Sequence, residues 1–167
     1  MKKIILLLAI LPLAMIVKAQ KFGYVNSLEL ISLMPEAIEA DSLLAVFQQS
    51  VQTQYNSYLQ EYQTKAAEYD ELLKTGTTAQ LIMEAKASDL QGMQQRITDF
   101  ETQSNTSLQD QRDKLYQPIL VKATELVKQV AEENGYKMIF DTSSGAIAYA
   151  PEGDNVIKLL AAKLGVE

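Results

Sequence analysis

Cysteine and histidine are both absent from the 167 residues of the chain. Without cysteine there can be no disulfide, and there is no thiol to act as a nucleophile or to be acylated by a lipid. Without histidine, Ser-His-Asp and Cys-His catalysis are excluded, together with the commonest ligand of transition metals. Carboxylates, lysines and tyrosines remain for chemistry. We therefore expect a protein that is not an enzyme, with no catalytic residue, metal or cofactor.

Positive charge is scarce as well. The chain has 15 Lys and Arg against 21 Asp and Glu, a net charge of −6. Lys2, Lys3 and Lys18 lie within the first 19 residues, so the rest of the chain has 12 basic and 21 acidic residues and a charge near −9. Nucleic-acid binding depends on Lys and Arg contacts to phosphate. The sequence therefore argues against a nucleic-acid partner and against anionic membrane surfaces.

Residues 1–19 have the pattern of a secretory signal peptide. Lys2 and Lys3 precede an apolar run from Ile4 to Val17, and Ala19 lies at a position suited to signal peptidase. The run is short for a membrane-spanning helix, which needs about 20 apolar residues. An uncleaved anchor is the alternative. We expect cleavage after Ala19 and leave these residues out of the fold prediction.

Residues 35–117 are predicted to form a long antiparallel helical hairpin. Pro35 suits the first position of a helix, and neither Pro nor Gly recurs before Gly76, which can take the left-handed conformation that ends a helix. One face of this helix is apolar at spacings of three, four or seven residues, at Leu44, Phe47, Val51, Tyr55, Tyr58, Tyr62, Tyr69 and Leu72. A second helix is predicted over about 78–133. Neither helix would be stable alone, so we expect them to pack together.

The second helix contains an unusually polar stretch. Between Glu101 and Asp113, Leu108 is the only large apolar residue. A tightly packed coiled coil keeps an apolar seam throughout its length. The stretch therefore indicates a soft hairpin that can splay apart, and the alternative is a segment that packs through a polar face.

Residues 20–34 and 118–167 are predicted to form a small α/β body. Phe22–Val25 and Tyr136–Phe140 have the composition of strands, and Ala146–Tyr149 is predicted to return beside the second one as a β-hairpin. Capping residues open two short helices: Asn26, and Asp154 for a last helix to about Leu164. A body of about 60 residues is marginal alone, which argues for an oligomer.

Pro35 and Pro118 are predicted hinges. When residues are counted from a turn centred on Gly76, Pro118 lies almost level with Pro35. Pro118 has no N–H and clashes with the carbonyl of Lys114, so a kink is expected. We expect the two prolines to mark where the hairpin joins the body. A kink without functional meaning is the alternative.

Several short segments occur in a distinctive order. They are Phe22-Gly23-Tyr24-Val25-Asn26, Met34-Pro35-Glu36-Ala37, a Gln-rich hairpin, Gln117-Pro118-Ile119, Val130-Ala131-Glu132-Glu133-Asn134-Gly135-Tyr136, Ile139-Phe140-Asp141, and Ala148-Tyr149-Ala150 followed by Asp154. In order and spacing the chain resembles the Skp/OmpH family of periplasmic chaperones. The resemblance covers everything after residue 19, and no single motif carries it alone.

The resemblance implies an α+β fold, mostly α, assembled as a jellyfish-like homotrimer. Three bodies would build a small β-barrel, and three hairpins would surround a cavity that holds unfolded outer-membrane β-barrel proteins without ATP. The apolar strand residues would then form the barrel core and trimer contact: Phe22, Tyr24, Val25, Ile139, Phe140, Ile147 and Tyr149.

One departure from the family concerns charge. The best-known members are basic, and lipopolysaccharide binding is ascribed to their positive arms. Residues 36–130 of this chain hold 8 basic and 14 acidic residues, a charge of about −6. We therefore do not expect lipopolysaccharide binding, and we expect clients to be held chiefly by apolar contact.

The hairpin offers six candidate client contacts. They are Tyr55, Tyr58, Tyr62, Tyr69, Met83 and Met93. Tyrosine has an apolar ring with a polar tip, and methionine adapts to varied partners. Ordinary packing in the hairpin seam is the alternative for each. Asp141, the residue that a catalytic interpretation would select, is predicted to form a turn, because no acid, base or nucleophile lies near it in sequence.

Together with the residues above, the resemblance implies an ATP-independent periplasmic holdase for unfolded outer-membrane proteins. The alternative is a structural coiled-coil adaptor of the periplasm that binds one folded partner. The two differ in breadth, because a holdase binds several unfolded clients and few folded ones.

Overall fold

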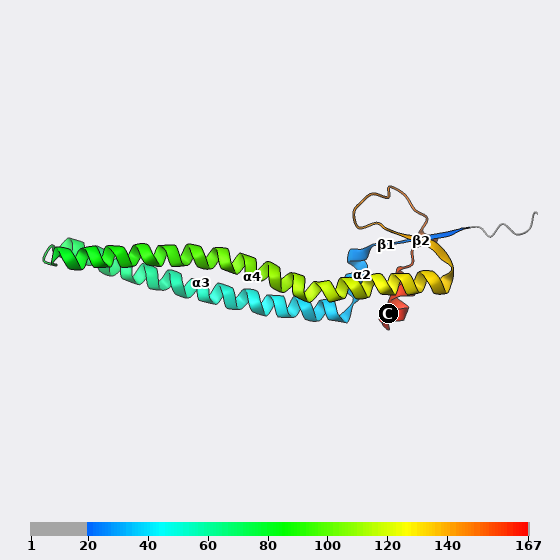
Figure 1. Ribbon diagram of the computed structural model, residues 1–167, viewed down its shortest axis with the longest axis horizontal. Helices are drawn as coiled ribbons and strands as arrows, with labels where there is room; N and C mark the ends of the chain where they lie inside the picture. Colours follow the sequence, from blue (N-terminus) through cyan, green and yellow to red (C-terminus); the bar gives the residue numbers. More distant parts are fainter. Residues whose placement is uncertain (1–19, 167) are drawn as a thin grey trace, which may run out of the picture. The chain divides into compact units, whose positions relative to one another are not determined.

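The computed structural model describes residues 20–166, so the predicted signal peptide and its cleavage site lie outside the described residues. The elements in chain order are β1 (Lys21–Val25), α2 (Ser27–Leu33), α3 (Pro35–Thr75), α4 (Gln80–Asn134), β2 (Tyr136–Asp141), the 3₁₀ turn η2 (Glu152–Asp154) and α5 (Ile157–Leu164) (Figure 1). The prediction of a mostly helical α+β chain is confirmed. Across residues 20–166, no helix has both the length and the apolar character needed to cross a membrane.

The described residues separate into two compact units. Residues 20–33 and 122–166 form the first, which we call the body unit, and residues 34–121 form the second, the hairpin unit. The chain passes from one to the other at residues 33/34 and, within α4, at residues 121/122.

The hairpin unit consists of α3 and the N-terminal three-quarters of α4, which lie side by side and antiparallel (Figure 1). Pro35 occupies the start of α3, as predicted, because the first turn of a helix leaves its N–H groups unpaired anyway. The 41 residues of α3 extend for about 60 Å. Gly76 ends α3 with a φ of 63°, and its N–H donates to the Leu72 carbonyl at 3.3 Å. The predicted glycine stop is therefore confirmed.

Cross-helix contacts give the register of the hairpin. Lys65 Nζ lies 2.6 Å from Asp89 Oδ2, Lys86 Nζ lies 3.4 Å from Glu68 Oε2, and the Tyr116 hydroxyl donates to Asp41. These pairs are centred near residue 78, because the connection spans residues 76–79 and Gly76 is only its first residue. Pro118 is therefore nearly level with Glu39, and the predicted alignment with Pro35 is off by about one helical turn.

The sheet of the body unit differs from the prediction. β1 and β2 pair in parallel, with Gly23 opposite Ile139 and Tyr24 opposite Phe140. Ala146–Tyr149 is not a strand, so the predicted β-hairpin is wrong. The free side of β1 is used instead by residues 155–156, where Val156 donates its N–H to the Tyr24 carbonyl at 2.9 Å. Across residues 20–166, no strand pairs with residues 146–149, so this segment gains no ladder hydrogen bonds that would fix it as a strand.

The two short helices of the body unit begin differently. Asn26 Oδ1 accepts from the N–H groups of Leu28 and Glu29 at 3.0 and 3.3 Å, which confirms the predicted cap of α2. For α5 the predicted cap is wrong: Asp154 belongs to η2, and the N-cap position is Val156, which makes no side-chain cap hydrogen bond. Asn155, one residue before Val156, accepts from Ile157 N–H through its Oδ1 at 2.9 Å.

Buried apolar side chains hold the body unit together. Leu30, Val130, Val156 and Leu160 are at most 1% exposed, and they come from α2, α4, the segment before α5, and α5. Gly23 of β1 is buried beside them. A Cβ at this position would lie 2.9 Å from the Tyr136 ring and 2.9 Å from Val156, so only glycine lets the strand approach so closely.

Candidate binding surfaces

The seam between α3 and α4 buries little. Between residues 41 and 118, all of which the structure describes, only Met93 and Ser104 are buried. Ser104 is 8% exposed and lies in the polar stretch that the sequence analysis singled out. A serine in the seam fills far less space than the leucines of a tight coiled coil, so the two helices are poorly filled at this level.

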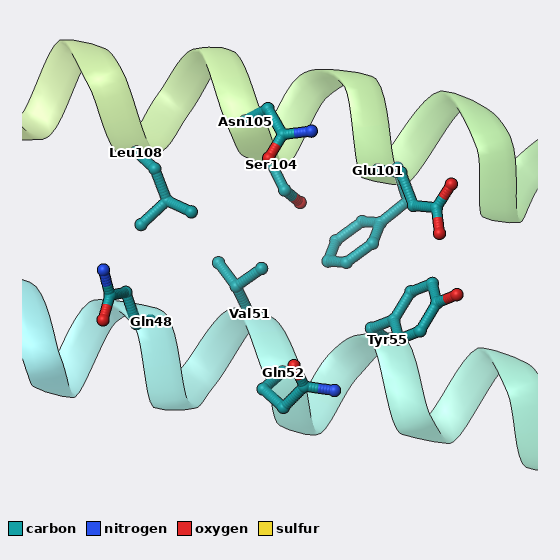
Figure 2. A pocket seen from close by; sticks show the side chains of 9 residues that line it. Gln48, Val51, Gln52, Tyr55, Glu101, Ser104, Asn105 and Leu108 are labelled. Carbon is teal, nitrogen blue, oxygen red and sulfur yellow. The ribbon is translucent and has the colours of Figure 1, made fainter.

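A groove of about 520 Å³ opens on one face of the hairpin at the level of Ser104. We call it the front groove (Figure 2). Its lining residues are Gln48, Val51, Gln52 and Tyr55 of α3 and Phe100, Glu101, Ser104, Asn105 and Leu108 of α4. Figure 2 shows Val51 and Leu108 projecting into the space between the helices, and Tyr55 facing Glu101 at one end.

A second groove of about 420 Å³ lies at the same level. We call it the back groove, and it is lined by Phe47, Ser50, Val51, Gln54, Phe100, Gln103, Ser104 and Ser107. Successive residues of a helix are turned by about 100° about its axis. Gln48 and Gln52 therefore lie on one side of Val51, and Phe47 and Gln54 lie on the other. The two grooves therefore occupy opposite faces of the hairpin, and Val51, Phe100 and Ser104 form the thin wall between them.

The chemistry of the front groove is mainly neutral. Gln48, Gln52 and Asn105 contribute amides, and Val51, Phe100 and Leu108 contribute apolar surface. Glu101 is the single ionisable acid among its described lining residues, and none of them is basic. Hydrogen bonding toward the Glu101 carboxylate, followed by desolvation, raises the pKa of Tyr55. The carboxylate faces Tyr55 at one end of the groove (Figure 2).

The seam closes again on the side nearer the turn. The rings of Tyr58 and Phe100 meet edge to face, with centroids 5.2 Å apart and planes at 82°. Farther along, Lys65 and Asp89 form an ion pair across the two helices. Their hydrogen bond raises the pKa of Lys65 and lowers that of Asp89. These contacts hold the helices together on one side of the grooves, and the Tyr116–Asp41 bond does so on the other.

The six candidate client contacts do not share one environment. Tyr55, Tyr58, Tyr62, Tyr69 and Met83 are half-buried, so each keeps some surface available. Met93 is 4% exposed in the single chain, and its role as a client contact stays a prediction. Of the six, only Tyr55 lines the front groove.

Sequence reasoning did not identify most of the groove residues as a binding surface. Gln48, Gln52, Ser104 and Asn105 carry no motif. The polar stretch from Glu101 to Asp113 was the one sequence feature that indicated a loosely packed seam. The sequence of one helix, however, cannot show which α3 residues lie opposite that stretch. That assignment requires the register of the hairpin.

The predicted trimer-contact residues gather at an apolar hollow of the body unit. Phe22, Tyr24, Phe140, Ile147 and Tyr149 line a hollow of about 320 Å³, together with Gly23, Ala150, Pro151 and Asp154. Phe22, Phe140 and Tyr149 are 43%, 46% and 84% exposed. Ile139 is half-buried, and Val25 is 3% exposed because alternate residues of β1 face opposite sides. The hollow is an open apolar surface in the single chain.

Asp141 has a structural setting. Its two carboxylate oxygens accept four hydrogen bonds, from the N–H and hydroxyl of Ser27 and of Ser143, at 2.7 to 3.1 Å. Burial alone would raise the pKa of Asp141, but these bonds outweigh it and hold the pKa at about 2. Asp141 forms the predicted turn through Ser143, and it also fastens that turn to the start of α2.

The described residues contain no cluster of three or more acidic side chains suited to a metal ion. Pro35 begins α3, and Pro118 lies inside α4, which continues to Asn134. Their role as hinges stays a prediction.

Comparison with known proteins relates the chain to one sequence family and to solved structures. The sequence model of a family described as "Outer membrane protein (OmpH-like)" matches residues 21–164. A crystal structure of a candidate outer membrane chaperone (OmpH-like) from Caulobacter crescentus superposes with a TM-score of 0.75 at 16% identity, over 87% of this chain and 83% of that one. At this identity the structural likeness establishes the shared fold. No individual curated protein matches the chain at a significant level.

Proposed function

The chain belongs to the OmpH-like family of outer membrane proteins, and from this premise we propose that it acts as a periplasmic, ATP-independent holdase. Its clients are unfolded outer-membrane β-barrel proteins, which it keeps from aggregating. The observation that carries the proposal is the hairpin unit, whose long helices bury little between them and leave open grooves on both faces. Such a surface suits weak contact with many chains better than one tight contact with a folded partner.

The proposed assembly is a homotrimer joined through the apolar hollow of the body units. Exposed aromatic surface of this kind is typical of an interface. Three hairpins would then face one client, and many weak contacts on three arms add up through effective concentration while each stays reversible. The proposal includes cleavage of residues 1–19, no enzymatic activity and no nucleic-acid partner.

Charge limits the proposal in one respect. Residues 36–130 carry about −6, so the arms would repel anionic lipids and acidic segments. We propose that clients are held by apolar and neutral polar contacts, and we do not include lipopolysaccharide among the ligands.

Light scattering of residues 20–167 tests the proposal, first alone and then with an outer-membrane β-barrel protein diluted from urea. We expect the mass of a trimer, and a client that stays soluble at about one assembly per client without nucleotide. A monomer or dimer beside which the client aggregates would refute the holdase. Capture of one folded partner, with no protection of unfolded clients, would favour the coiled-coil adaptor.

A further inference from the structure

The front groove combines three properties that together select a ligand. It has an apolar floor made by Val51, Phe100 and Leu108, its rim carries amides from Gln48, Gln52 and Asn105, and its described lining includes no cation. Resting on the proposed function, we propose that the front groove binds a short, extended and uncharged polypeptide segment of the client.

The amide rim matches a polypeptide backbone. A side-chain amide offers both a donor and an acceptor, and an extended backbone presents N–H and C=O groups that need both. An anion would need several donors and a cation several acceptors, whereas amides serve neither as well as a charged side chain does. The rim therefore favours a neutral backbone over an ion.

The dimensions agree with a few residues of strand. Gln48 and Tyr55 are seven positions apart on α3, a distance of about 10 Å along the helix axis. Three residues of extended chain cover about the same length. Alternate side chains of such a segment point in opposite directions, so one apolar side chain can reach the floor between Val51 and Leu108 while its neighbours face water. Membrane-facing strands of β-barrels have this alternation.

Charge excludes the other classes of segment. An acidic side chain would meet Glu101 and the negative charge of the arm. A lysine would be attracted to the arm as a whole and to Glu101, but the apolar floor would strip water from the ammonium group. Binding in the groove should therefore be insensitive to salt, whereas attraction to the arm should be screened by it.

Two matched pairs of variants test the site. Ser104→Leu fills the seam and both grooves with a leucine, and Thr102→Leu makes the same kind of change at an exposed position of α4 that lines neither groove. Gln52→Glu puts a charge on the rim of the front groove, and Gln49→Glu puts one on the same helix outside both grooves. Both α3 sites are exposed, so the second pair remains informative if Ser104→Leu fails to fold.

The measurement is fluorescence anisotropy with dye-labelled peptides of alternating leucine and threonine, and with peptides in which lysine or glutamate replaces threonine. Residues 20–167 should bind the neutral peptide with an affinity that stays within about twofold between 0.05 and 0.5 M salt. Ser104→Leu and Gln52→Glu should weaken this binding by about fivefold or more, whereas Thr102→Leu and Gln49→Glu should leave it within about twofold.

Client protection is measured on the same proteins, so that the two proposals can fail separately. If wild type protects the client but Ser104→Leu and Gln52→Glu bind the neutral peptide as wild type does, the groove is not the site and the holdase stands. If wild type prefers the lysine peptide and loses it in high salt, charge rather than the groove selects the client. If wild type neither binds the peptide nor protects the client, both proposals are overturned.

Discussion

The Asp141 carboxylate at the end of β2 accepts hydrogen bonds from both the backbone N–H and the hydroxyl of Ser27, at 3.1 and 2.7 Å, although the two residues are 114 positions apart. Ser27 is the first residue of α2. The contact therefore joins the end of β2 to the start of α2, the helix that follows β1. It also places the negative charge of Asp141 at the positive end of α2.

We expect Asp141→Ala to destabilise the body unit. It removes four hydrogen bonds, and loss of a capping carboxylate typically costs about 1–2 kcal/mol. Urea unfolding followed by circular dichroism measures the change in the free energy of unfolding. Glu152→Ala, at an exposed acid of η2, is the control and should stay within about 0.5 kcal/mol. Equal losses in the two variants would show that the network contributes nothing specific.

The low pKa of Asp141 predicts a dependence of stability on pH. Its pKa is about 2 in the folded chain and near 3.8 when the chain is unfolded. Because the folded pKa is the lower one, its contribution is fully present above about pH 4 and is lost as the pH falls toward 2. The difference in unfolding free energy between wild type and Asp141→Asn should be constant at higher pH and shrink over this window. A difference that grows on acidification would contradict the assigned network.

Two glycines should respond to alanine in opposite directions. At Gly23, a Cβ would be 2.9 Å from Tyr136 and from Val156, so Gly23→Ala should cost about 1–3 kcal/mol through overpacking. At Gly92, in the middle of α4, a Cβ meets nothing within 4 Å, so Gly92→Ala should stabilise by about 0.5–1 kcal/mol through helix propensity. Thermal denaturation of the two variants measures both signs. A neutral Gly23→Ala would mean that β1 and Tyr136 are not so close.

The ion pair between Lys65 and Asp89 should stabilise the hairpin unit in a salt-dependent way. Lys65→Asp and Asp89→Lys each place like charges across the seam, so each should lower the melting temperature in dilute buffer. The double variant should recover part of the loss, because Glu61 remains beside position 65. The differences should fade in concentrated salt, since both groups are solvent-exposed. Single-variant losses that persist unchanged in high salt would rule out an electrostatic cause.

The proposed trimer predicts that the apolar hollow controls assembly. The rings of Phe22 and Phe140 lie 6.3 Å apart, and both are nearly half exposed in the single chain. Phe22→Ser combined with Phe140→Ser should reduce the mass measured by light scattering, because the apolar area that would be shared is lost. Val46→Ser, at a residue of α3 that is 70% exposed, is the matched control and should leave the mass unchanged. An oligomer that survives the double variant must be joined elsewhere.

The sequence alone predicted the helices and their ends well. Pro35 begins α3, Gly76 ends it, and Asn26 caps α2. These features depend on residues within one turn of each other, and the local conformational preferences of proline, glycine and asparagine are strong enough to decide them.

The tertiary structure alone decided how the strands pair and where the seam opens. β2 is parallel to β1, which lies more than 110 residues earlier. Asn155 pairs with Tyr24 of β1, a contact that was not predicted. The grooves depend on Ser104 of α4 being opposite Val51 of α3, and hence on a hairpin centred near residue 78. Such contacts are between residues distant in sequence, and their partners are chosen by packing and by the hydrogen-bonding needs of the backbone, which no local pattern contains.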